Sequence, residues 1–382
     1  MVEVMPVDHS AAAAKVRFSE EKSGDSVLGF IALDHARALN ALDLSMLQAI
    51  GDKLLEWRSR DEIACIVLHS DFERAFCAGG DVKTLAVALQ KEDGLALARA
   101  YFTTEYFVDY LIHAYPKPIL CWADGITMGG GIGVMNGASC RVVTERSALA
   151  MPEVAIGLFP DVGGSYFLSR MPQSLGLFLA LTGAGFTGCD AVVLGLAEGL
   201  IPAERKNAVL SGLRDLAWSK DKRVNKATLA NYVAQAYDNA AREKSELWQR
   251  RATIERLAAG DTIEEIDAKL RSWSGNDPSI ERAIRGYLAG SPTSARVVFE
   301  QLRSGATLSL RDVFLREWHM AIRFCERSDF TEGVRARLVD KDNRPRWNPP
   351  ALAAVRGEDV ARYFAPHDGP HPLEEKFRAA GI

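Results

Sequence analysis

The sequence predicts an α/β fold for the first half of the chain and a helical region after it. Segments typical of strands and helices alternate up to about residue 204, which argues against an all-α or an all-β protein. Two uninterrupted apolar runs, residues 63–68 and 119–122, are typical of strands that are covered on both faces. Beyond residue 204, amphipathic helical patterns follow one another and strand patterns are hard to find.

The elements of the first half follow in a regular order. Residues 26–33 (SVLGFIAL) read as a strand, and Asp43 is placed to cap a helix whose apolar residues recur at helical spacing. Glycine-rich residues 129–133 lead into a short helix, and two further short strands are expected at 142–144 and 148–150.

The second half carries signals for helix starts. Asp261 to Glu264 and Ser309 to Asp312 both fit the capping-box pattern, and Pro292 occupies a position that the first turn of a helix tolerates. We therefore expect an α/β domain at residues 14–210 and a helical domain at 211–382.

Composition excludes several classes of function. The 382 residues are 48% hydrophobic and 25% charged, with a net charge of −4, which gives no reason to expect a nucleic-acid partner. No apolar run reaches the ~18 residues that span a bilayer, and the first fifteen residues lack the Arg-rich pattern of a transit peptide, so a cytoplasmic location is expected. The six cysteines are scattered, which predicts reduced thiols and no metal site.

Three segments combine glycine with acidic residues: 76–81, 125–133 and 151–164. None of them ends in the Gly-Lys-Ser/Thr of a phosphate-binding loop, completes a dinucleotide fingerprint or forms a Gly-x-Ser-x-Gly elbow. Glycine at a strand-to-helix junction leaves amide N–H groups free, and two such turns facing each other would form an oxyanion hole. The alternative for each run alone is ordinary turn chemistry.

These segments resemble the crotonase (enoyl-CoA hydratase/isomerase) superfamily, and within it the 3-hydroxyisobutyryl-CoA hydrolase branch. The matching stretches are AFCAGGD at 75–81, DGITMGGG at 124–131, residues 151–170, LTG at 181–183, SPTS at 291–294 and residues 329–349. The resemblance implies a crotonase-like core of repeated ββα units followed by a helical C-terminal region. It implies hydrolysis of a short 3-hydroxyacyl-CoA thioester, most simply 3-hydroxyisobutyryl-CoA in valine degradation.

The resemblance also assigns residues. It implies that the amides of Gly80 and Gly130 grip the thioester carbonyl, that Asp81 and Val82 lie along the CoA adenine, and that Glu105 contacts the substrate. CoA enters as part of the substrate, so no separate cofactor, nucleic acid or membrane is expected as a partner. A homo-oligomer is a possible state, because crotonase relatives commonly form trimers.

The carboxylates distinguish hydrolysis from hydration. Hydratases of the superfamily use two glutamates, and the position of the first is Gly133 here, while the second is present as Glu153. Asp161 stands eight residues later, where hydratases have glycine. We expect Glu153 either to attack the carbonyl or to act as a general base, with Asp161 managing the proton. Enoyl-CoA hydration and a non-catalytic scaffold are the alternatives.

The same residues also have structural interpretations. Glu105 would otherwise be a solvated glutamate on a helix face. Asp161 would otherwise cap the turn at residues 162–164. The Asp340 to Asp342 run is expected to form a salt-bridged corner of the fold.

Overall fold

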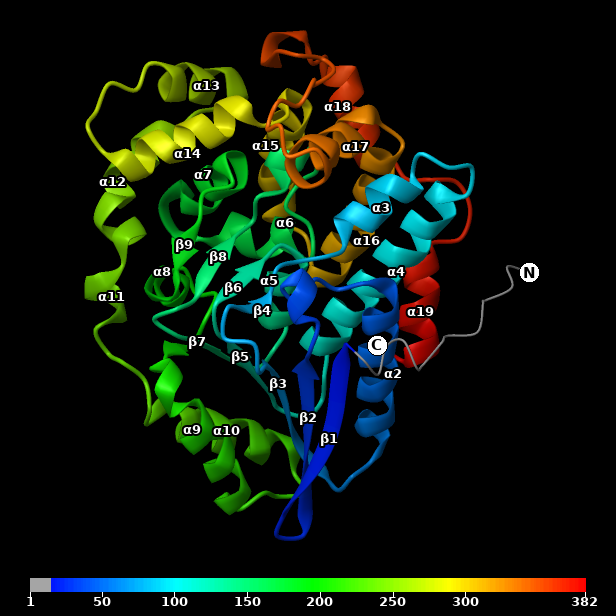
Figure 1. Ribbon diagram of the computed structural model, residues 1–382, viewed down its shortest axis with the longest axis vertical. Coiled ribbons are helices and arrows are strands. Elements are labelled where there is room, and N and C mark those ends of the chain that lie inside the picture. Colours follow the sequence, from blue (N-terminus) through cyan, green and yellow to red (C-terminus); the bar gives the residue numbers. More distant parts are fainter. Residues whose placement is uncertain (1–14) are drawn as a thin grey trace.

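The computed structural model describes residues 15–382 (Figure 1). The first 14 residues, on which the expectation of a location rested, lie outside the described part. A six-stranded sheet with the order β1-β2-β3-β5-β7-β10 forms the centre, and only its β1–β2 pair is antiparallel. Its strands are β1 (Val16–Ser23), β2 (Ser26–Leu33), β3 (Ile63–Ser70), β5 (Ile119–Ala123), β7 (Cys140–Val143) and β10 (Gly199–Leu200).

A second sheet of four short strands runs alongside the first. Its strands are β4 (Ala75–Cys77), β6 (Ile126–Met128), β8 (Ala148–Ala150) and β9 (Phe186–Thr187). The chain passes from β3 to β4, from β5 to β6 and from β7 to β8, and a helix follows each step, which is the expected ββα repeat. Because β4, β6 and β8 are parallel neighbours, the turns that follow these three strands meet at one edge of the small sheet.

Both faces of the large sheet are covered, as the apolar runs at 63–68 and 119–122 predict. One face packs on α9 (Lys206–Gly212) and α10 (Lys222–Ala234), at the lower left of Figure 1. The other faces α2 (Leu44–Ser59), which Asp43 caps through the Met46 amide, and α4 (Gly94–His113). The helices α9 and α10 thus straddle the expected domain boundary at residue 210, and the division into two domains stays a prediction.

Helices make up most of the remainder and cross the top of Figure 1. Those within the first half are α3 (Val82–Ala88), α5 (Gly130–Asn136), α6 (Gly164–Phe167), α7 (Leu175–Thr182) and α8 (Gly188–Val193). Those of the second half are α11 (Ala241–Lys244), α12 (Glu246–Ala258), α13 (Ile263–Arg271), α14 (Pro278–Ala289), α15 (Pro292–Gly305), α16 (Leu310–Cys325), α17 (Ser328–Val334), α18 (Gly357–Phe364) and α19 (Pro372–Ala380).

Two of the three expected helix starts are confirmed. Pro292 is the first residue of α15, and the Ser309 side chain accepts from the Asp312 amide at the start of α16. The expected capping box at 261–264 is wrong by one residue, because the Thr262 side chain accepts from the Glu265 amide. Burial of Ile263 and of other apolar residues at helical spacing sets this register.

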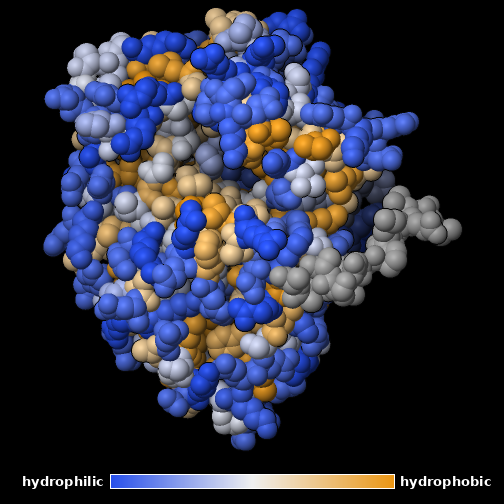
Figure 2. All heavy atoms as spheres, viewed as in Figure 1, coloured by the Kyte–Doolittle hydropathy of each residue, from blue (hydrophilic) through white to orange (hydrophobic). Residues whose placement is uncertain are grey.

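The surface and the expected structural corner agree with the sequence. Polar and charged residues cover most of the face shown in Figure 2, and apolar residues gather there in small patches. Arg335 bridges Asp340 at 2.5 Å and Asp342 at 2.7 Å, so this run is a salt-bridged corner. All six cysteines are free. Within residues 15–382, no helix has the length and apolar character needed to cross a membrane.

Candidate active site

Two glycine turns meet at the edge of the small sheet. One follows β4 and contains Gly79 and Gly80, and the other follows β6 and contains Gly129 and Gly130. A Cβ on Gly79 would lie 3.1 Å from the carbonyl oxygen of Met128, and one on Gly130 would lie 3.3 Å from the Gly80 nitrogen. Gly79 and Gly129 have φ angles of 108° and 48°, which favour glycine. A Cβ at Gly79 or Gly130 would therefore crowd the backbone of the facing turn, so the two turns lie close together.

The amides of Gly80 and Gly130 have no hydrogen-bond acceptor among the described residues. The Gly80 turn is held by its neighbours, since the Leu42 amide donates to Gly79 and the Asp81 amide donates to Leu42. Gly130 is the first residue of α5, where the helix dipole is positive.

Glu105 lies against both turns. Its side chain comes from α4, is only 3% exposed, and accepts a hydrogen bond at 3.1 Å from the Tyr101 hydroxyl. Its Oε1 is 2.5 Å from the position that a Cβ on Gly130 would occupy and 3.3 Å from that on Gly80. The interpretation of Glu105 as a solvated helix-face residue is therefore wrong.

Glu153 reaches the same place from the end of β8. It begins the 3₁₀ helix η2 (Glu153–Ile156) and is 5% exposed. Its Oε1 lies 2.8 Å from where a Cβ on Gly129 would be, and its Oε2 has no partner among the described residues. A buried carboxyl oxygen without a partner next to two free amides is an arrangement suited to a ligand.

Asp161 is the second acid of the site, and α4 holds it in place. It is 5% exposed, and its Oδ2 accepts a hydrogen bond from the Tyr106 hydroxyl at 2.6 Å. Its side chain does not cap a helix, because α6 begins at Gly164 with Gly163 as its N-cap. The interpretation of Asp161 as an N-cap is thus wrong.

The protonation of these acids follows from burial. Burial raises the pKa of Glu105 and of Glu153 well above the usual range, and the nearby Asp161 charge raises both further. Burial also raises the pKa of Asp161, but the hydrogen bond from Tyr106 opposes this and leaves it at about 6. The pKa of Asp161 is thus raised less than that of Glu105 or Glu153, so Asp161 is the acid that loses its proton most readily.

The position of the missing hydratase glutamate is closed. A Cβ on Gly133 would lie 2.7 Å from the Cβ of Val162 and 2.9 Å from Oδ2 of Asp109. Asp109 is fully buried one helical turn after Glu105, and its two oxygens have no partner in residues 15–382. Burial, then the nearby carboxyls of Glu105 and Asp161, raise its pKa well above the ordinary value.

The turn that presents Asp161 is anchored from the helical region. The carboxylate of Glu317, on α16, accepts from the amides of Gly163 and Ser165, both at 2.8 Å. Gln301, on α15, donates to the Pro160 carbonyl at 2.7 Å and to the Ser165 hydroxyl at 2.9 Å. No sequence motif points to these two residues or to Tyr106, because they come from elements distant along the chain from the 160–165 turn.

Asp81 and Val82 border the Gly80 turn. Asp81 caps α3 by accepting from the Thr84 amide at 3.1 Å, and both residues are partly exposed. They lie at the surface next to the site, and a role in binding CoA is a proposal taken up below.

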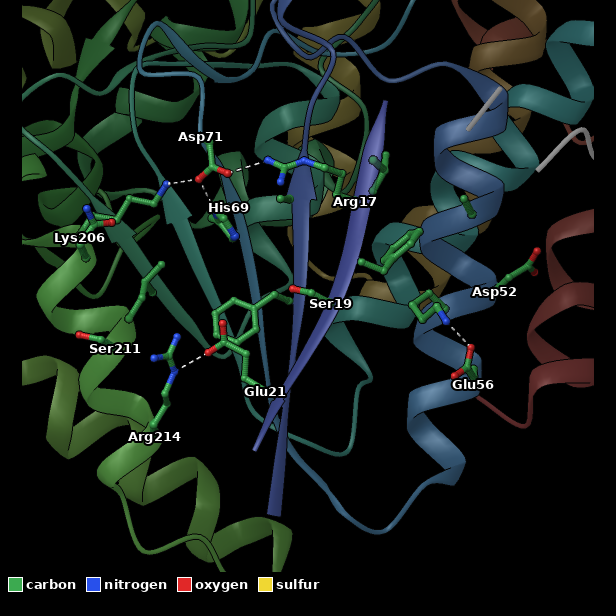
Figure 3. A pocket seen from close by; sticks show the side chains of 18 residues that line it. Arg17, Ser19, Glu21, Asp52, Glu56, His69, Asp71, Lys206, Ser211 and Arg214 are labelled. Carbon is green, nitrogen blue, oxygen red and sulfur yellow. Dashed lines mark hydrogen bonds and ion pairs between the residues drawn. The ribbon is translucent and has the colours of Figure 1, made fainter. Parts of the chain in front are cut away.

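A separate cavity of about 1010 Å³ lies around the edge strand β1, between α2 and α9 (Figure 3). Its charged groups pair with one another: Arg17 and Lys206 both bind Asp71, and Arg214 binds Glu21. None of the carboxyls of the candidate site lines this cavity, so it is not a candidate for the acyl group.

Comparisons with known proteins identify similar chains. The family model described as enoyl-CoA hydratase/isomerase matches residues 28–364. The chain is 38% identical to the mitochondrial 3-hydroxyisobutyryl-CoA hydrolase of Danio rerio over 94% of its length and 91% of that protein. It is 35% identical to the hydrolase of the same name from Homo sapiens, over 93% and 90%.

Two solved structures are similar across nearly the whole chain. A carnitinyl-CoA dehydratase from Mycobacterium thermoresistibile has a TM-score of 0.81 at 34% identity, covering 93% of this chain and 97% of its own. An enoyl-CoA hydratase from Rhodobacter sphaeroides has a TM-score of 0.80 at 34% identity, covering 91% and 97%. The similarity includes the C-terminal helices as well as the sheets.

The comparisons correct one expectation from the sequence. A cytoplasmic location was expected, but the hydrolases that the chain resembles are named as mitochondrial proteins. That expectation is wrong. It rested on the missing transit-peptide pattern in the first residues, which lie outside the part of the chain that the structure describes.

Proposed function

Since the chain belongs to the enoyl-CoA hydratase/isomerase family, and within it to the 3-hydroxyisobutyryl-CoA hydrolases, we propose that it hydrolyses the thioester of a short 3-hydroxyacyl-CoA. The substrate is 3-hydroxyisobutyryl-CoA, and the products are 3-hydroxyisobutyrate and CoA, a step of valine degradation. The observation that carries the proposal is the buried Glu153 against the glycine turns, close enough to Asp161 for that charge to raise its pKa, with the hydratase position at Gly133 closed.

In this proposal the thioester carbonyl oxygen binds between the amides of Gly80 and Gly130. Each well-placed donor stabilises the tetrahedral oxyanion by about 3 kcal/mol, because the donors are fixed before the charge develops. Glu105 lies against both turns, and its raised pKa favours the protonated form, which can donate a hydrogen bond to the substrate without repelling the oxyanion.

The two acids share one proton through the reaction. Asp161, ionised at rest, accepts the proton of Glu153. Glu153 then either attacks the thioester carbon to give a mixed anhydride or takes a proton from an attacking water. As the carbon–sulfur bond breaks, Asp161 returns its proton to the departing CoA thiolate. In the anhydride route, a water then cleaves the anhydride and restores Glu153.

The remaining assignments belong to the same proposal. Asp81 and Val82, partly exposed beside the Gly80 turn, lie along the CoA adenine, so CoA is held as part of the substrate and no further cofactor is needed. Residues 14–210 carry the acyl-CoA site and residues 211–382 form the helical domain. A homo-oligomer stays a prediction.

A second candidate is hydration of an enoyl-CoA, because one of the two similar structures is that of an enoyl-CoA hydratase. The two reactions differ in whether a thiol is released. We expect CoA release from 3-hydroxyisobutyryl-CoA and none from crotonyl-CoA. Loss of the enoyl absorbance of crotonyl-CoA without CoA release would instead establish hydration.

Replacement of Glu153 by Gln tests whether the chain is a catalyst at all. The amide keeps the size of the side chain but can neither attack nor exchange a proton, so we expect hydrolysis to fall by at least about 10²-fold. A Glu153→Gln protein as fast as the wild type would favour a non-catalytic scaffold and remove this assignment.

A further inference from the structure

The turn of residues 160–165 has little regular structure of its own to hold Asp161. Val162 and Gly163 both have positive φ angles, 51° and 89°, and the short helix α6 begins only at Gly164. A non-glycine residue in this region of φ is strained and keeps its conformation only where surrounding contacts impose it. The contacts that impose it here come from the helical region.

Glu317 supplies the principal contact. Its carboxylate is completely buried and takes the amides on both sides of Gly164, through Gly163 and Ser165, at 2.8 Å each. A carboxylate with one oxygen on each amide fixes the orientation of the turn as well as its position. Gln301, also completely buried, adds hydrogen bonds to Pro160 and Ser165.

The helix that carries Glu317 also contacts the partner of Asp161. The Trp318 indole donates to Thr103 of α4 at 2.8 Å, one turn before Tyr106. The rings of Phe314 and Tyr106 lie 6.0 Å apart in an edge contact. Thus α16 holds both the turn that carries Asp161 and the helix segment that carries the Tyr106 hydroxyl.

We propose that Glu317, supported by Gln301, is a positioning residue for the reaction: it holds the 160–165 turn so that Asp161 stays within reach of Tyr106 and of the proton of Glu153. The proposal rests on the proposed thioester hydrolysis. The hydrogen bonds of Glu317 go to the 160–165 turn and not to the Gly80 or Gly130 amides, so we expect its effect on the chemical step and not on the binding of CoA.

The test is Glu317→Gln in the full-length protein. A carboxamide keeps the shape, but its NH2 group must face one of the two amide donors. A displacement of about 1 Å at a reacting group lowers the rate by about 10²-fold, so we expect kcat to fall by about 30- to 100-fold with KM within about threefold of the wild type. Gln301→Met removes the two other hydrogen bonds, keeps Glu317 and should lower kcat by a smaller factor in the same direction.

Asp190→Asn is the matched control. Asp190 is also a buried carboxylate that accepts two backbone amides, those of Thr187 at 2.8 Å and Leu247 at 2.9 Å, and it joins α8 to the helical region. Its other hydrogen bonds come from the hydroxyls of Thr187 and Ser245. We expect a comparable loss of thermal stability with kcat within twofold of the wild type. A merely structural role for Glu317 would make the two variants behave alike.

The outcomes separate the two proposals. A wild-type protein that releases no CoA from any short 3-hydroxyacyl-CoA refutes the proposed function. If the wild type is active, the positioning role is refuted when Glu317→Gln and Gln301→Met keep full kcat. It is also refuted when both variants change KM as much as kcat. If Glu317→Gln does not fold, an unchanged kcat in Gln301→Met refutes that role, and a lowered kcat at constant KM supports it.

Discussion

Replacing Tyr106 by Phe tests the charge balance of the site. The change removes one hydroxyl, which donates to Asp161 at 2.6 Å inside a buried cluster of acids. Hydrogen bonds to charged groups contribute about 1.5–3 kcal/mol, and 1.36 kcal/mol corresponds to one pKa unit. The loss should raise the pKa of Asp161 from about 6 by about one to two units.

The sign of the effect on activity follows from the role of Asp161 as proton acceptor. At pH 7 the ionised fraction should fall from about nine-tenths to between about one-half and one-tenth. We therefore expect kcat/KM at pH 7 to fall about two- to tenfold and to return to within about twofold of the wild type at pH 9. Acid–base groups show themselves in this way as a displaced limb of the pH–rate profile.

The assay is the release of CoA from 3-hydroxyisobutyryl-CoA, quantified chromatographically between pH 5 and 9.5. Tyr115→Phe is the matched control, because the Tyr115 hydroxyl is also buried and donates at 2.6 Å, but to the carbonyl of Leu54. Its profile should superimpose on that of the wild type. An unshifted acidic limb in Tyr106→Phe, or a loss of activity that persists at pH 9, would refute the proton-accepting role of Asp161.

Two further predictions concern the glycine turns and the buried acids. In Gly130→Ala the new Cβ would lie 2.5 Å from Glu105 Oε1, so the Gly130 amide should be displaced and kcat/KM should fall about 10²- to 10³-fold. Gly357→Ala is the control, because its Cβ would have nothing within 4 Å, and its kcat/KM should equal that of the wild type. Equal kcat/KM values for the two alanine variants would refute the binding of the oxyanion by the Gly130 amide. Asp109→Asn should raise the melting temperature above that of the wild type, and by more at pH 8.5 than at pH 5.5. The reason is that a carboxyl with a raised folded-state pKa lowers the free energy of unfolding as the pH rises from its unfolded pKa toward its folded pKa. The same increase at both pH values, measured by thermal unfolding, would show that Asp109 does not titrate in this way.

The sequence predicts the parts of the fold and site that depend on local pattern. Strand β2 and the Asp43 cap follow from local pattern and capping preference, and Glu153 and Asp161 follow from the resemblance of one continuous segment to the crotonase superfamily. The glycine turns are found for the same reason.

The rest depends on which distant elements meet. Tyr106 and Glu317 look like ordinary helix residues in sequence, and only the packing of α4 and α16 against the 160–165 turn gives them their contacts. The start of α13 was missed by one residue because two adjacent polar residues, Asp261 and Thr262, both suit a cap, and burial of Ile263 decides between them.

The parallel arrangement of β4, β6 and β8 places the parts of the candidate site on three separate connections. Each strand is followed at the shared edge by its own connecting segment: β4 by the segment with Gly80, β6 by that with Gly130 and β8 by that with Glu153. A residue change in one connection leaves the other two anchored by their own strands. An acid can therefore stand on one connection and not on another, as Asp161 and Gly133 do, while the backbone of the Gly80 and Gly130 turns keeps the position that the sheet gives it.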